Sequence, residues 1–269
     1  MKALAAGVVL LVAIFMGQQQ AARPLGNWPC GARLDPSYFQ LAEGTGGHLL
    51  LLAPEEIGDS AALLTALGRH GHTLFRMAGS LTPGLHQFQV PLDPSIESVV
   101  FSISVQCLQV ADILRPSGAA ASGDDVVDRS NFRAERMVIV KRPEAGMWTV
   151  RVSGSGVSGI VVQVRSTIGI ADVQFSPAES TNVTAVPTAG VENIVRIRMS
   201  GRVRDIRASI VSGTFLPLGA LPLERDEIDG SYLSRFTPGS DGFRVLIAGK
   251  DMDGTAFQRM HAPLMTPRR

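Results

Sequence analysis

The sequence contains few aromatic residues and almost no lysine. Aromatic residues make up 6% of the 269 positions, and the lysines are Lys2, Lys141 and Lys250, so nearly all of the 25 basic residues are arginines. Removing residues 1–22 takes away Lys2 and no acid, which leaves 24 basic and 24 acidic residues. A balanced charge argues against a general binder of nucleic acids or membrane surfaces.

Motifs of catalysis and of nucleotide binding are also missing. The sequence has no Gly-x-Ser-x-Gly elbow, no HExxH and no phosphate loop of the GxxxxGK[ST] type. Its glycine cluster at residues 44–47 follows a predicted helix and precedes a predicted strand, the reverse of the order in phosphate loops. We therefore interpret these glycines as a helix C-cap and a turn, and expect no enzyme and no cofactor.

Metal-ligand spacing is absent as well. Neither cysteine lies in a CxxC pair, and His70 and His72 would need further ligands to hold a metal, so we interpret them as loop histidines. The stretch 251–254 resembles the start of a calcium loop but lacks the third acidic position and the closing glutamate. A hairpin turn is the simpler interpretation, and we expect no bound metal.

The N-terminal sequence predicts export. Residues 3–17 form an apolar run behind a single cation, too short for a membrane span of roughly twenty residues. We interpret residues 1–22 as a signal peptide, with an uncleaved anchor as the alternative, and no later stretch is apolar enough to span a bilayer. In the oxidising compartment outside the cell, Cys30 and Cys107 would form a disulfide, the alternative being two free buried thiols.

Residues 23–78 are predicted to be a mixed α/β segment. Asp35 followed by Pro36 predicts a helix start, and the helix would end at Gly44 or Gly46. Residues 48–53 are continuously apolar and predict a buried strand. A second helix would start at residues 59–60 and end at Gly68.

From residue 85 onward the sequence changes to short, β-branched runs bounded by turn residues. Seven strands are predicted before residue 178, at 85–91, 98–105, 108–114, 133–141, 147–153, 160–165 and 171–175. This spacing is typical of a β-sandwich, which we assign to residues 79–178, and GSGVSG at 154–159 would form a hairpin within it. A protein starting near Ala78 is then expected to stay folded and soluble.

A second β-sandwich is predicted at residues 191–265, after a linker at 179–190. Its six strands are expected at 194–199, 203–211, 216–221, 232–236, 243–248 and 256–261. Asp253-Gly254 predicts a hairpin between the last two, and Pro217 and Pro222 place their segment at a sheet edge. Asn182 heads an Asn-Val-Thr sequon in the linker and predicts a glycosylation site if the protein is eukaryotic.

Arginines form the most prominent charge feature of the second sandwich. They are Arg196, Arg198, Arg202, Arg204 and Arg207. Guanidinium groups suit sulfates, phosphates and carboxylates, so a row of them could bind a glycosaminoglycan or another polyanion. The alternative is that they lie on the wet face of a sheet and pair with Glu224, Asp226 and Glu227.

Three stretches give the chain a family resemblance. Residues 35–52 (DPSYFQLAEGTGGHLLLL), 142–153 with 166–176 (RPEAGMWTVRVS and STIGIADVQFS), and 242–260 (GFRVLIAGKDMDGTAFQRM) resemble hemicentins. The similar region follows the von Willebrand factor A domain of these extracellular matrix proteins and precedes their immunoglobulin repeats. The resemblance covers about residues 35–262.

The resemblance implies a mainly β fold of two tandem immunoglobulin-like sandwiches, preceded by the end of an A domain. It also implies a secreted structural or adhesive role, with extracellular proteins or matrix components as partners. The Asp-x-Ser-x-Ser motif with which A domains bind their metal is absent, since Asp128-Arg129-Ser130 is followed by Asn131-Phe132. Metal-dependent adhesion is therefore not expected.

Overall fold

The protein is mainly β, in antiparallel sheets. A computed structural model describes residue 30, residues 34–180 and residues 182–268. The predicted signal peptide, residues 1–22, lies outside the described residues. None of the described helices is long and apolar enough to cross a membrane.

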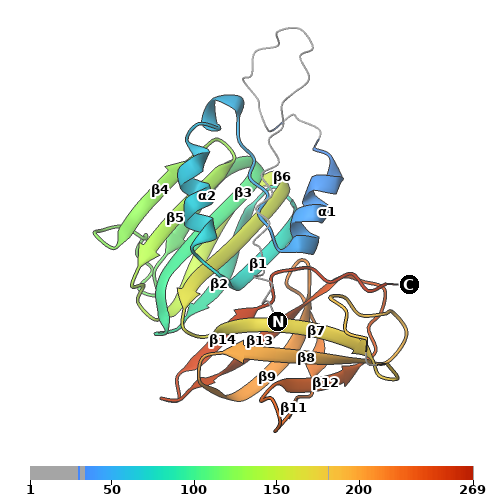
Figure 1. The fold of residues 1–269 in the computed structure, drawn as a ribbon. Helices are drawn as coiled ribbons and strands as arrows, with labels where there is room; N and C mark the ends of the chain where they lie inside the picture. Colours follow the sequence, from blue (N-terminus) through green and yellow to red (C-terminus); the bar gives the residue numbers. More distant parts are fainter. Residues whose placement is uncertain (1–29, 31–33, 181, 269) are drawn as a thin grey trace.

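The elements follow one another in the order shown in Figure 1. The helical ones are α1 (Pro36–Thr45), the 3-10 turn η1 (Pro54–Glu56) and α2 (Ser60–Gly68). The first strands are β1 (His72–Leu81), β2 (Leu85–Leu92), β3 (Ile96–Leu114), β4 (Val126–Asn131), β5 (Glu135–Lys141) and β6 (Gly146–Ser166). The later ones are β7 (Gly169–Pro177), β8 (Asn193–Ser200), β9 (Val203–Ser212), β10 (Pro217–Leu221), β11 (Glu224–Arg225), β12 (Tyr232–Phe236), β13 (Phe243–Asp251) and β14 (Ala256–Met260).

The strands form two sheets. The larger has the order β10-β9-β13-β14-β1-β6-β3-β5-β4, with β2 added beside β6, and the smaller has the order β11-β12-β8-β7. We call α1 to β6 the N-terminal unit and β7 to β14 the C-terminal unit. The larger sheet runs through both units, because β1 pairs with β6 on one edge and with β14 on the other, at Thr73 and Met260.

Two long bent strands build the N-terminal unit. The second half of β6 pairs with β1 and the first half of β3, while its first half pairs with β2 and the second half of β3. The register of β3 shifts at two bulges near Cys107, opposite Gly154 and Ser155. Bulges bend a strand, so both strands fold over a shared core in which Trp148 stacks on Phe101 at 5.6 Å.

The bend corrects two predictions. GSGVSG at 154–159 is not a hairpin but the bent middle of β6, where Gly156 has a φ of 89°. The predicted strands 98–105 and 108–114 are likewise one strand, β3. A bulged strand and a hairpin both need glycine, so local sequence does not distinguish them.

Helices and an irregular segment cover one face of the N-terminal sheet. Asp35 caps α1 by accepting a hydrogen bond from Ser37 N, and Gly46 ends the helix with a φ of 71°, which confirms both helix signals. The predicted strand at 48–53 is wrong, because these residues form no strand and join neither of the two described sheets. Instead Leu50 and Leu52 pack with Leu67, Val100, Met137 and Ile139 in a separate apolar cluster.

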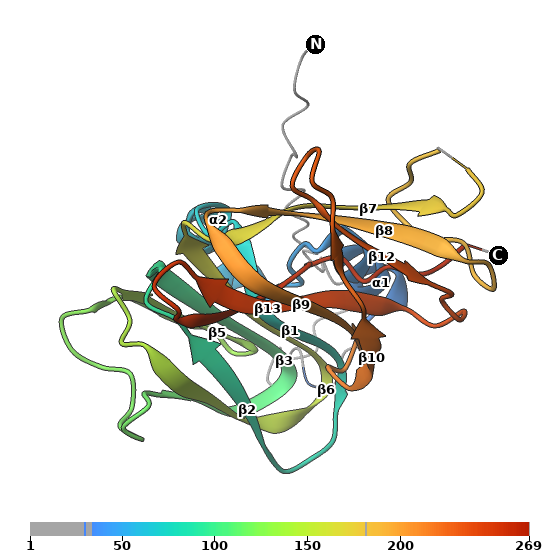
Figure 2. The same cartoon turned by 90° about the horizontal axis from the view of Figure 1, so that it is seen from below.

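The C-terminal unit consists of two facing layers. Figure 2 shows β7, β8 and β12 on one side of β9 and β13. The buried face of β8, Val195 and Ile197, packs against Val245 and Ile247 of β13. Asp253-Gly254 forms the turn of the β13–β14 hairpin, and β10 is an edge strand, as predicted.

Strand β7 corrects the expected assignment of strands to units. It was predicted to close the first sandwich, but it pairs with β8 along its length and contributes Val173 and Phe175 to the C-terminal core. Residues 178–190 therefore connect two paired strands of one sheet and are not a linker between two sandwiches. The predicted boundary at 178/179 divides β7 from its partner.

Candidate functional site

Five charged side chains lie where the two units meet. They are Glu43 of α1, Arg76 of β1, Asp93 of the β2–β3 turn, Arg244 of β13 and Arg259 of β14, and each is at least 94% buried. We call this cluster the seam. In Figure 1 the C-terminal unit lies below β1 and α1.

Glu43 joins both units through its two carboxylate oxygens. Arg76 Nε donates to Oε1 at 2.8 Å, and Arg244 Nη2 donates to Oε2. A buried carboxylate needs partners for each oxygen, since an unpaired charge in an apolar interior is strongly unfavourable. One residue of α1 is thereby held by a central strand of each unit.

The remaining guanidinium donors bind backbone oxygens. Arg76 donates to the carbonyls of Ala42, Gly46 and Gly47, which the end of α1 leaves without helical partners. Arg244 donates to Ala262 O at 2.9 Å and to Gly213 O at 3.3 Å. A cation at a helix C-terminus is favourable, so Arg76 satisfies the cap of α1, while Arg244 holds the chain at Gly213 and Ala262.

Arg259 forms the other half of the seam. Its Nη1 and Nη2 donate to Asp93 at 2.6 and 3.3 Å, which is the bidentate geometry of a strong arginine–carboxylate pair. Its other donors reach Ser95 Oγ, Ser166 Oγ and Ile168 O. Arg259 therefore ties the last strand of the C-terminal unit to two turns of the N-terminal unit.

Charge at the seam is not balanced. Three arginines face two carboxylates, so the buried cluster carries one excess positive charge. The pKa of Arg244 is lowered by burial, against the opposing effect of Glu43. Burial, followed by the neighbouring arginine, also lowers the pKa of His48 and of His261 to about 4. Both imidazoles are neutral at physiological pH.

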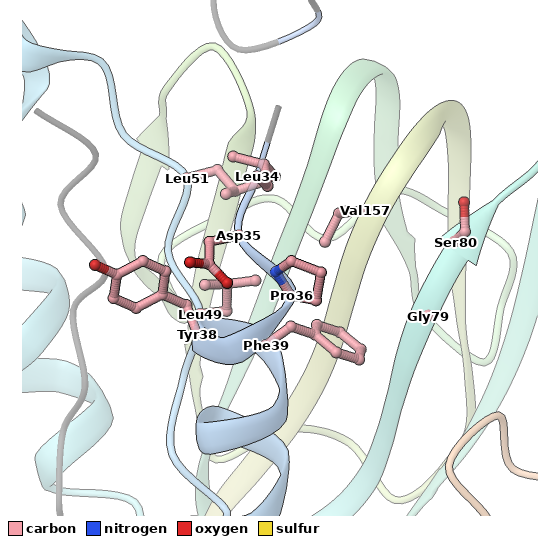
Figure 3. Close-up of a pocket in the computed structure, with 10 residues that line it drawn as sticks. All are labelled: Leu34, Asp35, Pro36, Tyr38, Phe39, Leu49, Leu51, Gly79, Ser80 and Val157. Carbon is pink, nitrogen blue, oxygen red and sulfur yellow. The ribbon is translucent and has the colours of Figure 1, made fainter. Parts of the chain in front are cut away.

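A hollow of about 290 Å³ lies between α1 and the bend of β6 and is mainly apolar. In Figure 3, Pro36 and Phe39 project from α1 toward the side that carries Val157, while Tyr38 projects the opposite way. The carboxylate on its wall, Asp35, already accepts from Ser37 N as the helix cap. The described residues around this hollow present no converging set of polar groups for catalysis.

The disulfide prediction is confirmed. Cys30 and Cys107 are bonded, and no free cysteine remains among the described residues. The bond joins the chain before α1 to the bulged part of β3. It therefore fastens the N-terminal segment to the point where the core strands bend.

The sequon residue Asn182 is exposed in the β7–β8 connection. The backbone of Thr184 pairs with Phe175, and its hydroxyl donates to Val186 O at 2.7 Å. The connection is thus anchored two residues after Asn182, while Asn182 itself stays at the surface. Glycosylation of this residue remains a prediction.

Four of the five predicted polyanion-binding arginines lie on two different sheets. Arg196 and Arg198 are on β8, while Arg204 and Arg207 are on β9, and β8 and β9 do not pair. Arg196 pairs with Asp226 and Asp229, and Arg198 pairs with Asp229 at 3.5 Å. Arg202 is exposed in the turn between the two strands. These arginines therefore do not form one continuous row. Polyanion binding stays a prediction.

Among the described residues, no group of three or more His, Cys, Asp or Glu side chains is arranged to hold a metal ion. Asp251, in the stretch that resembles a calcium loop, accepts instead from Thr255 N at 2.8 Å within the β13–β14 turn. His70 Nε2 lies 3.0 Å from Ser98 Oγ. His70 and Asp251 thus have structural contacts.

Sequence reasoning missed all five seam residues. A signal for three of them was present, since Arg76, Arg244 and Arg259 each interrupt an apolar strand, in FRM, FRV and QRM. A lone charge inside a buried strand requires a partner of opposite sign. That partner was not identifiable, because Glu43 and Asp93 lie far away in sequence.

Comparison with known proteins gives related sequences. The chain is 26% identical to mouse (Mus musculus) Hemicentin-1 and 25% identical to human (Homo sapiens) Hemicentin-1, in each case over 235 residues, 83% of this chain and 4% of the relative. It is 21% identical to mouse Hemicentin-2 over 249 residues, 86% of this chain and 5% of the relative. The chain thus matches a small part of these relatives, and no protein-family model matches it.

Solved structures resemble the chain only distantly. The propeptide form of the Bacillus licheniformis lipase BlEst2 gives a TM-score of 0.32 at 12% identity, over 71% of this chain and 40% of that one. A Bifidobacterium dentium beta-glucuronidase complexed with coumarin-3-O-glucuronide gives 0.26 at 8% identity, over 66% and 39%. These scores support no conclusion about fold or activity.

Proposed function

We propose that this hemicentin-like chain is a secreted, non-enzymatic structural protein of the extracellular-matrix type, acting through contacts with other proteins. The sequence similarity covers 83–86% of the chain, although it covers only 4–5% of each relative. Within the chain, the observation that carries the proposal is the seam. It joins two β units through buried ion pairs, with no converging catalytic groups among the residues that form it.

The seam suits a load-bearing role because it opposes motion between the units. Relative motion is the default for two units in one chain unless their interface is extensive. Here a sheet continues from β1 to β14, and Glu43 and Arg259 each bind across the interface. The two units would then transmit force as one rigid body.

The stretches that carry the family resemblance supply most of the seam. Residues 35–52 contain Glu43, residues 166–176 contain the Arg259 partners Ser166 and Ile168, and residues 242–260 contain Arg244 and Arg259. The resemblance therefore supports a role for the joint between the units. It gives no support to a reaction centre.

We also propose the finer assignments of fold. The facing layers of β7, β8 and β12 against β9 and β13 support an immunoglobulin-like sandwich in the C-terminal unit. The helices α1 and α2, packed on the N-terminal sheet, would be the remnant of an A domain. The unit boundary would then lie at residues 167–168, between β6 and β7.

Three features support action outside the cell. They are the predicted signal peptide at residues 1–22, the disulfide of Cys30 with Cys107, and the exposed sequon at Asn182. Disulfides persist in oxidising compartments, which fits an exported protein. The proposed partners are extracellular proteins or matrix components.

Expression of the full chain in a eukaryotic secretory cell tests this proposal. We expect the protein in the medium, with a mass that reports signal cleavage, one disulfide and one glycan. The secreted protein, fixed to beads, should capture defined matrix proteins, and beads carrying the reduced, unfolded protein serve as the control. Recovery from the cytosol alone would contradict the extracellular assignment.

Small-angle scattering of the same protein tests the structural mechanism. A rigid pair predicts one compact distance distribution, independent of salt, because buried ion pairs are screened weakly. Distributions that broaden with salt would show that the units move independently.

A further inference from the structure

A cavity of about 270 Å³ opens beside the seam. Four of the five histidines of the chain line it, namely His48, His70, His72 and His261. The fifth, His86, lies on β2 and reaches Thr82 O. These histidines come from three separate segments of the chain, and their position in one cavity calls for a physical reason.

The cavity walls contain no carboxylate, although Arg259 is part of them. The two acids of the seam, Glu43 and Asp93, are already paired with the seam arginines. The seam has one more arginine than it has carboxylates, so its field in the cavity is positive. The histidines report this field: after burial, the pKa of His48 is lowered by Arg76, of His72 by Arg259 and of His261 by Arg244.

Two of the four imidazoles have fixed polar partners. His48 Nε2 lies 2.9 Å from Gln163 Oε1, and His70 Nε2 lies 3.0 Å from Ser98 Oγ. No hydrogen bond involves the imidazole of His72 or of His261 within the part of the chain that the structure describes. These two rings keep donors for a ligand.

The strand register brings these two free rings together. Thr73 of β1 pairs with Met260 of β14 in antiparallel fashion, so the same register continued by one residue would set His72 opposite His261, and both line the cavity. Directly opposed residues of an antiparallel pair place their side chains on the same face, about 5 Å apart at Cβ. Gly169 leaves room for the ring of His72, since a Cβ at residue 169 would overlap that ring.

We propose that this cavity binds a small oxyanion, a carboxylate, sulfate or phosphate group, through the N–H groups of His72 and His261. The anion would offset the excess positive charge of the seam and accept hydrogen bonds from the two imidazoles. Pockets for drug-sized ligands start at about 300 Å³, so this cavity suits a single ion or one charged group of a larger molecule. One histidine comes from each unit, so the bound anion bridges them.

Histidine side-chain NMR of the full mature protein tests this inference, independently of where the protein acts. Sodium sulfate, phosphate and acetate are titrated in separate series at constant ionic strength, with sodium chloride as the balancing salt. We expect saturable shifts at His72 and His261 and a rise of at least one unit in their apparent pKa, with His86 unchanged. The anion that saturates at the lowest concentration identifies the group.

Matched variants give the second measurement. His261→Gln should weaken binding of the same anion by about tenfold or more, and His86→Gln should leave it unchanged. Gly169→Ala, which displaces the ring of His72, should weaken it as well. Shifts that do not saturate, or shifts of equal size at His86, would overturn the proposal. Both are measured on the wild-type protein, so the test holds even if a variant fails to fold.

Discussion

Glu43 of α1 accepts a hydrogen bond from Arg244 of β13, which lies 201 positions later in the chain. The same carboxylate pairs with Arg76, so removing it leaves two buried guanidinium groups without their counter-ion. Breaking a buried pair by deleting one partner costs about 3–5 kcal/mol. The stability of both units therefore depends on a side chain from a ten-residue helix.

We expect Glu43→Gln to lower the free energy of unfolding by about 3 kcal/mol or more. Urea denaturation followed by tryptophan fluorescence measures the change. The matched control is Glu97→Gln, since Glu97 pairs with Arg165 at the exposed surface. Surface pairs contribute about 0–1 kcal/mol, so equal losses in the two variants would contradict the role given to Glu43.

A protein that starts at residue 79 should fail to fold, contrary to the expectation from the sequence. It would lack most of β1, which lies between β14 and β6, and also Leu50, Leu52 and Leu67, which cover the N-terminal sheet. Near-ultraviolet circular dichroism and gel filtration measure the outcome. A protein that starts at residue 23 is the control and should remain monodisperse. A cooperative unfolding transition in the shorter protein would disprove this prediction.

Glu135 should make the protein less stable as the pH rises. It is fully buried, and burial raises its pKa from 4.5 to about 7, against the hydrogen bonds from Ser104 and Ser102. A folded-state pKa above the unfolded value means that the stabilisation is complete below about pH 4.5 and is lost as the pH rises through 7. The loss is about 3 kcal/mol at most.

Glu135→Gln isolates this effect, because glutamine keeps the shape and does not ionise. We expect the variant to be more stable than the wild type at pH 8 and the difference to shrink toward pH 5. The buried His48 and His261 have depressed pKa values, so their contribution has the opposite slope, but it is the same in both proteins. A difference that does not depend on pH would contradict a raised pKa that lies between pH 5 and pH 8 for Glu135.

Reducing the disulfide should destabilise the protein by about 4 kcal/mol in the loop-entropy model, since the bond closes a loop between residues 30 and 107. Urea midpoints with and without dithiothreitol measure this. Replacement of both cysteines by serine provides the control, because dithiothreitol should then change nothing. Equal midpoints for the wild type under the two conditions would contradict a structural role for the bond.

Heparin affinity chromatography tests the arginine hypothesis. Arg196 and Arg198 are paired with aspartates, whereas Arg202 and Arg207 have no recorded acidic partner among the described residues. We therefore expect Arg202→Glu with Arg207→Glu to lower the eluting salt concentration more than Arg196→Glu with Arg198→Glu. A larger effect of the Arg196→Glu and Arg198→Glu substitutions would instead indicate β8 as the binding face. If the column does not retain the wild type, a heparin-like ligand is excluded.

Local signals in the sequence predicted local structure correctly. Asp35, Gly46 and the Asp253-Gly254 turn each act within about four residues, and each does what its residue type predicts. The predicted strand at 48–53 was wrong, because an apolar run shows that a segment is buried and leaves open whether it pairs. Its leucines are buried by packing on β3 and β5.

The remaining differences between the predicted and the observed structure come from contacts between residues far apart in the sequence. β7 was assigned to the wrong layer because nothing within it indicates that its partner follows sixteen residues later, at Asn193. The cavity histidines were judged one by one as loop residues, and only the register of β1 against β14 brings His72 and His261 together. The two cysteines were the exception, since their number and the predicted export identified the pair.

Because β1 pairs with β14, one edge of β1 lacks its partner strand until the end of the chain has been synthesised. A nascent chain that has released α1 and β1 holds Arg76 and Glu43 without Arg244, which follows 168 residues after Arg76. Synthesis proceeds at about 5–20 residues per second, so this edge of β1 stays open for roughly ten seconds or longer. Exposed strand edges invite wrong pairing during that time, and we expect the nascent protein to depend on chaperones until β14 has emerged.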